Sequence, residues 1–229
     1  MHVVILAAGM GTRLGGDQPK PLTEISPGLS LLGAQVETLS ALTNRDRITL
    51  VLGYAAMSVM ESFPDLQYVF NPRFKDTNTA KSLLCALRKA DDDVLWTNAD
   101  LYFEKPAARR LLAGDGTRLL VDRSHVGEEE IKYTTHDDGS IAELSKQVAE
   151  PLGEALGMNV IAKDDLPQFI EQLDAVGAQD YFEKALENLT ASRAIKATPI
   201  AIESEYCREV DFPEDLEAVR AHLSAGRPS

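Results

Sequence analysis

The sequence contains little cysteine and little histidine. Its two cysteines, Cys85 and Cys207, are too few for a disulfide framework, and no two cysteines have the CxxC spacing. The four histidines, at positions 2, 125, 136 and 222, are too scattered for a zinc site. These absences exclude a disulfide-rich scaffold and a structural zinc protein. They favour a reducing, cytoplasmic location.

Basic residues are also scarce. The chain has 23 Lys and Arg against 36 Asp and Glu, which gives a formal net charge of −13. Nucleic-acid backbones and anionic lipid surfaces are bound by clusters of Lys and Arg. The composition therefore excludes a non-specific binder of nucleic acid or of a membrane surface. It still allows one small phosphorylated substrate, because a local basic pocket can bind a single phosphate in an acidic protein.

Long hydrophobic runs are missing as well. No apolar stretch approaches the ~20 residues that span a bilayer. The N-terminal segment runs directly into a strand-like stretch with no basic region before it, so no signal peptide is expected. With 229 residues, of which 44% are hydrophobic, the chain can bury one sizeable core. We expect one domain over residues 1–225 and a frayed tail over 226–229.

Short apolar runs alternate with segments of helical periodicity, which is typical of βαβ units. The pattern predicts an α/β fold with a Rossmann-like, mostly parallel sheet sandwiched by helices. Strands are expected at 3–7, 48–52, 66–70, 93–97, 119–121 and 197–202. Helices are expected after caps at Ser30 and Asn78, over 165–176 and 180–189, and from Pro213 onward. The polar segment at about 122–160 holds β-like runs at 131–133 and 141–144, and is expected to leave the sheet and lie over the substrate.

A glycine-rich segment, LAAGMGTRL at residues 6–14, follows the first expected strand. Backbone amides of such a turn can point at a phosphate. The segment is not a Walker A loop, since no GKS or GKT follows, and Leu14 stands where a dinucleotide loop has its third glycine. Two cations accompany it: Arg13 within the loop, and Lys20 between two prolines. This pattern predicts a site for the phosphates of a nucleoside triphosphate.

This loop together with the following PKPL resembles the signature of the sugar-phosphate and alcohol-phosphate nucleotidyltransferases. These enzymes join a nucleoside triphosphate to a phosphorylated metabolite and release pyrophosphate. The resemblance is strong over residues 3–22 and extends more loosely to about residue 220. Within the superfamily the chain is most similar to the small phosphocholine- or phosphonate-type cytidylyltransferases. The similarity rests on Asn78-Thr79-x-x-Ser82-Leu83, on a short chain without an added β-helix, and on Gly153-Glu154 before Gly157-Met158-Asn159.

The resemblance implies CTP as the nucleotide. It implies nucleotide contacts from residues of the loop and of the later turn, namely Leu6, Ala7, Ala8, Gly9, Gly11, Thr12, Asn78, Thr79 and Ser82.

Carboxylates stand at two further places. Asp100 follows an apolar strand, and Glu209-x-Asp211 lies in an extended segment whose alternation puts both side chains on one side. The attack of one phosphate on another brings two anions together, and a divalent cation held by carboxylates neutralises them. Alone, each aspartate could be a turn or cap residue. The resemblance places Asp100 and Asp211 where the family holds magnesium, although Ala99 replaces the family's usual glycine. We therefore expect Mg²⁺, with Asp100, Asp211 and Glu209 as candidate ligands.

The acceptor side is less specific. Lys132 and Lys146 flank the two β-like runs, and the resemblance puts Lys146 on the acceptor's phosphate; Glu154 could face a cationic or hydroxylated head group. The acidic run 128–130 is expected to be solvated. Aromatic residues make up only 6% of the chain, and Trp96, inside an expected strand, belongs in the core. An aromatic cage for choline is therefore not secured, and a phosphonate or another phosphorylated small alcohol fits equally.

The resulting hypothesis is Mg²⁺-dependent transfer of a nucleotide from CTP to a small phosphorylated alcohol or phosphonate. Arg13, Lys20 and Lys146 are the expected catalytic cations. One alternative keeps the chemistry but uses UTP or dTTP and a sugar 1-phosphate. Another is a non-catalytic nucleotide-sensing subunit. The oligomeric state stays open, a homodimer included.

Overall fold

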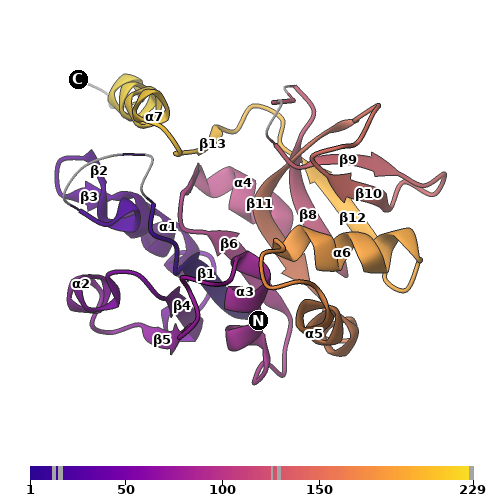
Figure 1. Cartoon of the computed structure of the whole chain (residues 1–229). Helices are drawn as coiled ribbons and strands as arrows, with labels where there is room; N and C mark the ends of the chain where they lie inside the picture. Colours follow the sequence, from indigo (N-terminus) through magenta and orange to yellow (C-terminus); the bar gives the residue numbers. More distant parts are fainter. Residues whose placement is uncertain (12–13, 15–17, 125, 128–129, 227–229) are drawn as a thin grey trace.

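The first strand, β1 (His2–Ala7), lies in the middle of the central sheet of this computed structural model (Figure 1). The structure describes residues 1–11, 14, 18–124, 126–127 and 130–226. Strand β1 pairs in parallel with β4 (Ile48–Leu52) on one side and β6 (Val94–Asn98) on the other, and β5 (Gln67–Phe70) pairs in parallel with β4. The predicted α/β fold with a mostly parallel sheet is confirmed.

Helices cover both faces of this sheet, and the side chains of β1 therefore pack into two separate cores. Val4 and Leu6 pack on one side, while Val3 and Ile5 pack on the other. The first core includes side chains of α3 (Thr79–Leu87), α5 (Leu166–Ala175) and α6 (Phe182–Ala191); the second includes α1 (Leu31–Ser40), α2 (Ala56–Ser62) and α4 (Lys105–Leu112). A strand buried on both faces needs an uninterrupted apolar run, as residues 3–7 have.

The predicted helix caps and the core tryptophan are confirmed. Ser30 accepts a hydrogen bond from the Gly33 amide at 3.0 Å, and Asn78 accepts one from the Thr79 amide at 2.9 Å. Trp96 is fully buried, with its ring 5.3 Å from that of Phe169.

The second half of the sheet corrects the prediction for residues 122–160. Strand β11 (Gly153–Ile161) runs antiparallel between β6 and β8 (Thr117–Asp122), inside the sheet. Strands β9 (Lys132–Thr135) and β10 (Ile141–Ser145) extend the sheet beyond β11, and β12 (Ala197–Ala201) pairs in parallel with β8. The segment therefore continues the sheet, and its position over the acceptor stays a prediction. A register shift between Ala155 and Asn159 needs Gly157, at φ +66°, so glycine marks an irregular strand here and not a loop.

A small two-stranded sheet brings the C-terminal part of the chain to the carboxyl end of β6. Strands β7 (Leu101–Phe103) and β13 (Cys207–Glu209) pair antiparallel, and the Val210 amide donates to the Asp100 carbonyl at 2.9 Å. Helix α7 (Pro213–Ala225) follows and begins at the predicted proline.

The remaining elements are short. Strands β2 (Glu24–Ser26) and β3 (Leu29–Ser30) form a hairpin that shares a third core with α7, and η1 (Lys20–Leu22) and η2 (Arg45–Arg47) are single 3₁₀ turns. Within the described ranges, no helix combines the length and apolar character needed to cross a membrane. Residues 227–229 of the expected tail lie outside the described residues.

Candidate active site

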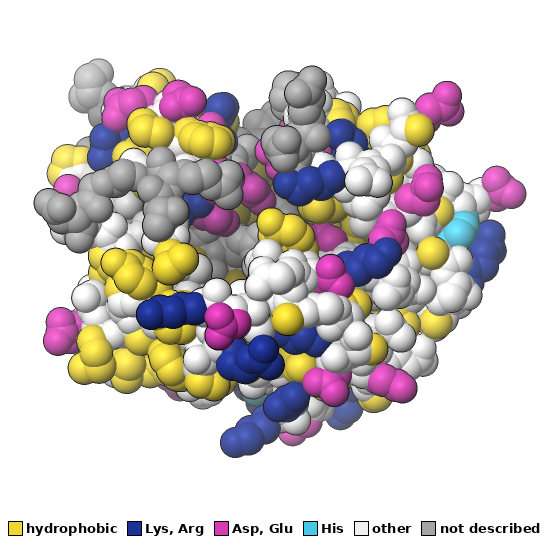
Figure 2. Space-filling model, viewed as in Figure 1, with side chains coloured by type: hydrophobic (Ala, Val, Ile, Leu, Met, Phe, Trp, Pro, Cys, Tyr) yellow, Lys and Arg dark blue, Asp and Glu magenta, His cyan; other side chains and the backbone are white. Residues whose placement is uncertain are grey.

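The candidate site lies at the carboxyl ends of β1 and β6. These strands are parallel neighbours, so the segments that follow them meet at one edge of the sheet, where open α/β sheets bind ligands. The Ala99 amide donates to the Leu6 carbonyl at 3.1 Å and ties the two segments together. Figure 2 shows acidic and basic side chains next to each other near the centre of the molecular face that faces the viewer.

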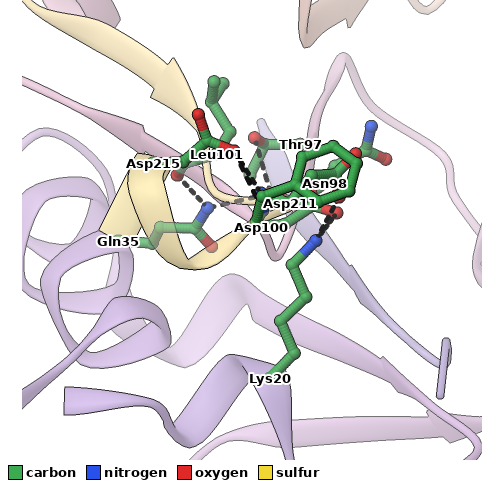
Figure 3. Close-up of polar contacts among 9 residues, drawn as sticks. Lys20, Gln35, Thr97, Asn98, Asp100, Leu101, Asp211 and Asp215 are labelled. Atoms are coloured by element: carbon green, nitrogen blue, oxygen red, sulfur yellow. Dashed lines mark hydrogen bonds and ion pairs between the residues drawn. The ribbon is translucent and has the colours of Figure 1, made fainter. Parts of the chain in front are cut away.

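Lys20 forms ion pairs with Asp100 and Asp211, the two aspartates that the sequence predicts to bind metal. Its ammonium Nζ donates to Asp100 Oδ2 at 2.9 Å and to Asp211 Oδ1 at 2.6 Å (Figure 3). The Lys20 side chain is 10% exposed, and the two carboxylates are 30% and 29% exposed. Burial by itself would lower the pKa of Lys20, but the charge of Asp100 and the hydrogen bonds to both aspartates outweigh it and raise that pKa. The ammonium is therefore charged and is held between two carboxylates.

The position of Lys20 is set by its own turn and by the glycine-rich loop. Pro19 and Pro21 flank it in η1, and its carbonyl accepts a hydrogen bond from the Thr23 amide at 3.1 Å. Gly11 packs against its side chain in a left-handed conformation, at φ +57°. Arg13 and Thr12, the other predicted residues of this loop, lie outside the described residues.

Gln35, a residue that the sequence did not single out, holds the turn that carries Asp100. Its Nε2 donates to the Asn98 carbonyl at 2.8 Å and to the Leu101 carbonyl at 2.5 Å, and the residue is 2% exposed. Ala99 fits the turn because its φ is not positive, so the glycine that is usual in the family is not required. Among the described residues nothing donates a hydrogen bond to Asp100 Oδ1, which is buried.

Asp215 holds the segment that carries Asp211. Its Oδ2 accepts the amides of Asp211 at 3.1 Å and of Phe212 at 2.9 Å, and its Oδ1 pairs with Arg208. The sequence contains a signal for this role, because an acidic residue in the first turn after Pro213 is typical of a capping arrangement. Gln35 has no comparable local signal, since its partners lie more than 60 residues away in the chain.

The structure does not group Glu209 closely with Asp100 and Asp211, and its part in a metal site stays a prediction. The described part of the chain contains no group of three or more His, Cys, Asp or Glu side chains that could hold one ion. Glu209 Oε1 lies close to Gly157 on β11. Strand β13 ends at Glu209, and the amide of Asp211 already donates to Asp215 of α7. Burial and the charges of Asp100 and Glu130 hold the pKa of Glu209 well above its usual range.

The pair Asp100 and Asp211 nevertheless suits magnesium. Both carboxylates already converge on one cation, the Lys20 ammonium, and Asp100 Oδ1 is buried without a donor among the described residues. Mg²⁺ is commonly held by one or two carboxylates, with waters and substrate phosphates completing its shell. The donor set therefore needs no third carboxylate.

The predicted acceptor residues lie around β9, β10 and β11. Lys132 Nζ donates to the Lys146 carbonyl at 3.1 Å, so Lys132 supports the backbone at Lys146. Lys146 Nζ lies 5.9 Å from the centre of the Tyr181 ring. Glu154 Oε2 accepts the Gly127 amide at 2.9 Å.

Two further glutamates face this region. The sequence predicts a solvated Glu130, but it is half-buried; residues 128 and 129 of the same run lie outside the described residues. Burial, together with the charges of Glu154 and Asp211, raises the pKa of Glu130. Glu183, in the first turn of α6, is 7% exposed; burial raises its pKa to about 7, although the charge of Lys146 opposes the shift. Its Oε2 is buried and receives no hydrogen bond from the described residues. The sequence did not indicate Glu183, because its position is an ordinary helical one.

The predicted nucleotide-contacting residues occupy two places. Leu6, Ala7 and Ala8 are buried at the end of β1, and Ala8 accepts the Tyr54 amide, whereas a methyl group on Gly9 would meet no atom within 4 Å. In the later turn, Thr79 Oγ1 accepts the Phe182 amide at 3.2 Å.

Ser82 and Asn78 complete that later turn. Ser82 is 5% exposed and accepts a hydrogen bond from Asn71, and Asn78 caps α3. These contacts fasten the turn to the protein, and nucleotide binding by its residues stays a prediction.

The sequence model of the MobA-like NTP transferase domain matches residues 3–188. The chain belongs to this family. A bifunctional protein GlmU from Halorhodospira halophila is 30% identical over 207 residues, which cover 86% of this chain and 43% of that protein. A CMP-5'-(3-aminopropyl)phosphonate synthase from Streptomyces rubellomurinus is 32% identical over 122 residues, 49% of this chain and 19% of that protein. The chain thus spans less than half the length of these curated relatives.

Two solved structures share the fold over the whole chain. The inositol-1-phosphate CTP transferase from T. maritima has a TM-score of 0.80 at 16% identity, with 100% of this chain and 98% of that chain covered. The CTP:phosphocholine cytidylyltransferase from Streptococcus pneumoniae has a TM-score of 0.77 at 18% identity, with 97% and 98% covered.

Proposed function

We propose that the protein is a Mg²⁺-dependent cytidylyltransferase that joins CTP to a small phosphorylated alcohol or a phosphonate and releases pyrophosphate. The observation that carries the proposal is the charged Lys20 held between Asp100 and Asp211, at the strand ends beside a glycine-rich loop. A cation and two carboxylates at this edge are what a triphosphate and its metal need. A protein that only senses a nucleotide has no need of a two-carboxylate metal site.

The reaction is an in-line substitution at the α-phosphorus of CTP. An oxygen of the acceptor's phosphate or phosphonate forms the new P–O bond, and the bond from the α-phosphorus to pyrophosphate breaks. The acceptor is already an anion, so no side-chain nucleophile is required. Rate enhancement then comes from positioning and from neutralisation of charge.

Each cationic group has a separate part in this scheme. Lys20 stabilises the α-phosphate as charge develops, Arg13 contacts the leaving phosphates, and Lys146 holds the acceptor's anionic group. Asp100 and Asp211 would hold magnesium, which neutralises phosphate oxygens when it is bound. Gln35 and Asp215 keep the two carboxylates in position through the backbone.

Support for CTP comes from similarity. The resemblance of the turn at Asn78–Ser82, the two CTP-using proteins with the same fold, and the phosphonate CMP synthase all point to this nucleotide. The alternative, a sugar-1-phosphate enzyme that uses UTP or dTTP, is supported by a Bacillus anthracis protein of the same fold that is described as a glucose-1-phosphate thymidylyltransferase, with a TM-score of 0.76 at 16% identity. Cys85 and Cys207 form no disulfide, which supports our placement of the reaction in the cytoplasm.

A pyrophosphate-release screen tests the proposal. CTP, UTP and dTTP are each combined with phosphocholine, phosphoethanolamine, 2-aminoethylphosphonate, hydroxyethylphosphonate, glycerol phosphate, inositol phosphate and sugar 1-phosphates, with Mg²⁺ present. We expect turnover with CTP and one of the phosphorylated alcohols or phosphonates. Turnover only with UTP or dTTP and a sugar 1-phosphate would establish the alternative, and no turnover with any pair would favour a nucleotide sensor. The Asp100→Asn/Asp211→Asn variant is the matched inactive control.

A further inference from the structure

Two carboxylates that approach each other in a partly buried site need a positive charge between them. In this structure that charge is Lys20, with Nζ at 2.6 Å from Asp211 Oδ1 and 2.9 Å from Asp100 Oδ2. The Lys20 side chain is 90% covered, and each carboxylate is about 70% covered, because the exposed fractions are 10%, 30% and 29%. The protein therefore supplies a cation of its own to this pair of carboxylates.

A divalent cation and the ammonium cannot bind the same pair of oxygens together. Mg²⁺ requires carboxylate oxygens at about 2.0–2.1 Å. An ion at that distance from Asp211 Oδ1 and Asp100 Oδ2 would lie beside Nζ, and the two positive charges would repel each other. Each cation at these two oxygens therefore weakens the binding of the other.

We propose that Lys20 is the resident counter-ion of Asp100 and Asp211, and that it exchanges with the divalent cation when the nucleotide binds. The inference rests on the proposed function, which assigns the metal to these two carboxylates. The nucleotide provides what the exchange requires, because its phosphates accept the displaced ammonium as its metal meets the carboxylates. The metal alone offers Lys20 no new partner, so it binds weakly without nucleotide.

The backbone around Lys20 supports an exchange by the side chain alone. Pro19, Pro21 and the hydrogen bond from Thr23 fix the main chain, and Gly11 lies against Cβ. Rotation about the outer side-chain bonds therefore moves the ammonium while the rest of the residue stays in place. The ammonium remains near the glycine-rich loop, where the phosphates are predicted to lie.

The test measures Mn²⁺ binding, as a probe for Mg²⁺, to the full chain without nucleotide, by the electron paramagnetic resonance signal of free Mn²⁺. We expect Lys20→Met to bind Mn²⁺ at least tenfold more tightly than the wild type. Lys196→Met, on a lysine whose side chain is 65% exposed, should bind like the wild type. The double variant Lys20→Met/Asp100→Asn should lose the gain. Lys20→Gln serves as a second variant if the methionine variant folds poorly.

A second measurement uses the wild type itself. Acetylation of Lys20 by acetic anhydride, followed by mass spectrometry, should increase when Mg²⁺ is raised to concentrations that fill the site, while acetylation of Lys196 stays constant. Equal Mn²⁺ affinity of the wild type and the Lys20 variants would overturn the proposal. So would a gain that survives Asp100→Asn, or Lys20 acetylation that does not respond to Mg²⁺. None of these outcomes depends on turnover, so the pyrophosphate screen can succeed while this inference fails.

Discussion

Gly11 and Lys20 pack so closely that no side chain fits between them. A methyl group added to Gly11 would lie 2.5 Å from Cβ of Lys20, far inside van der Waals contact. Gly11 also has φ +57°, a conformation that other residues rarely adopt. Gly11 and Lys20 therefore form one packing unit, and a larger residue at position 11 displaces the lysine.

Replacing Gly11 by alanine tests whether this close packing keeps Lys20 in its place. We expect turnover to fall by about 100-fold, because a displacement of about 1 Å at a catalytic group costs this much. Gly28→Ala is the control: Gly28 has φ +74°, but a methyl group there would meet no atom within 4 Å. Both variants carry similar backbone strain, and only the first should lose pyrophosphate release. Equal loss in both would mean that strain alone is responsible.

Lys20→Ala removes a preorganised cation from the predicted reaction centre. Loss of one such group costs about 3–4 kcal/mol at the transition state, so turnover should fall by about two to three orders of magnitude. Lys196→Ala, at an exposed lysine paired with Asp138, should keep wild-type turnover. The measurement is steady-state pyrophosphate release with the pair of substrates found in the screen. Near-normal turnover of Lys20→Ala would refute its catalytic assignment.

Gln35→Met removes the donor shared by the Asn98 and Leu101 carbonyls and keeps a similar side-chain volume. We expect the free energy of unfolding to fall by about 1–3 kcal/mol, as for buried polar groups that lose their partner. Turnover should fall as well, because Asp100 lies within the loosened turn. Gln168→Met on an exposed position of α5 is the matched control for urea unfolding and for turnover. Unchanged stability of Gln35→Met would contradict the role assigned to this amide.

Glu205 gives a pH dependence of stability away from the site. Burial would raise its pKa, but hydrogen bonds from backbone amides at Glu203 and the guanidinium of Arg110 lower it from 4.5 to about 2. A carboxylate with a depressed pKa stabilises the fold above pH 4.5, and this contribution disappears as the pH falls toward 2. Glu205→Gln should therefore lower the free energy of unfolding by about 1–3 kcal/mol at pH 7, and by little near pH 2.

Urea unfolding at several pH values measures that difference. Glu203→Gln is the control, because the Glu203 carboxylate is 73% exposed and its ion pair with Arg110 contributes little. A loss in Glu205→Gln that is equally large at pH 7 and pH 2 would contradict the ionic origin of the effect.

Much of the fold could be predicted because its signals are local. The uninterrupted apolar run of β1, the caps Ser30 and Asn78, and the proline that begins α7 each depend on a few neighbouring residues. Whether such a short segment forms a strand, a helix cap or a helix start is determined mainly by its own backbone preferences and by the burial of its own side chains. The residue types of the candidate site were also visible for this reason, since a glycine-rich turn, a lysine between prolines and acidic residues after strands are local features.

Contacts between distant segments were not predictable in this way. The glycines at 153 and 157 predict an excursion where the structure has strand β11, because Gly157 serves a register shift against β8, a strand more than 30 residues away in the sequence. Alternation along an extended segment predicts Glu209 and Asp211 on one side, but only Glu209 belongs to a strand, β13. No local motif marks Gln35 or Glu183, because the role of each side chain depends on the distant segments that surround it in the fold.

The sequence alone determined that glycine-rich, basic and acidic residues follow the ends of strands, and from these residue types it predicted a phosphate site. Only the tertiary structure decided that Lys20 lies between Asp100 and Asp211, residues 80 and 191 positions further along the chain. The order of strands in the sheet and the β7–β13 pair bring these three together, and that order is set by the packing of the whole core. The sequence contains the three charged residues, but only the fold brings the Lys20 ammonium between the two carboxylates and so neutralises part of their charge.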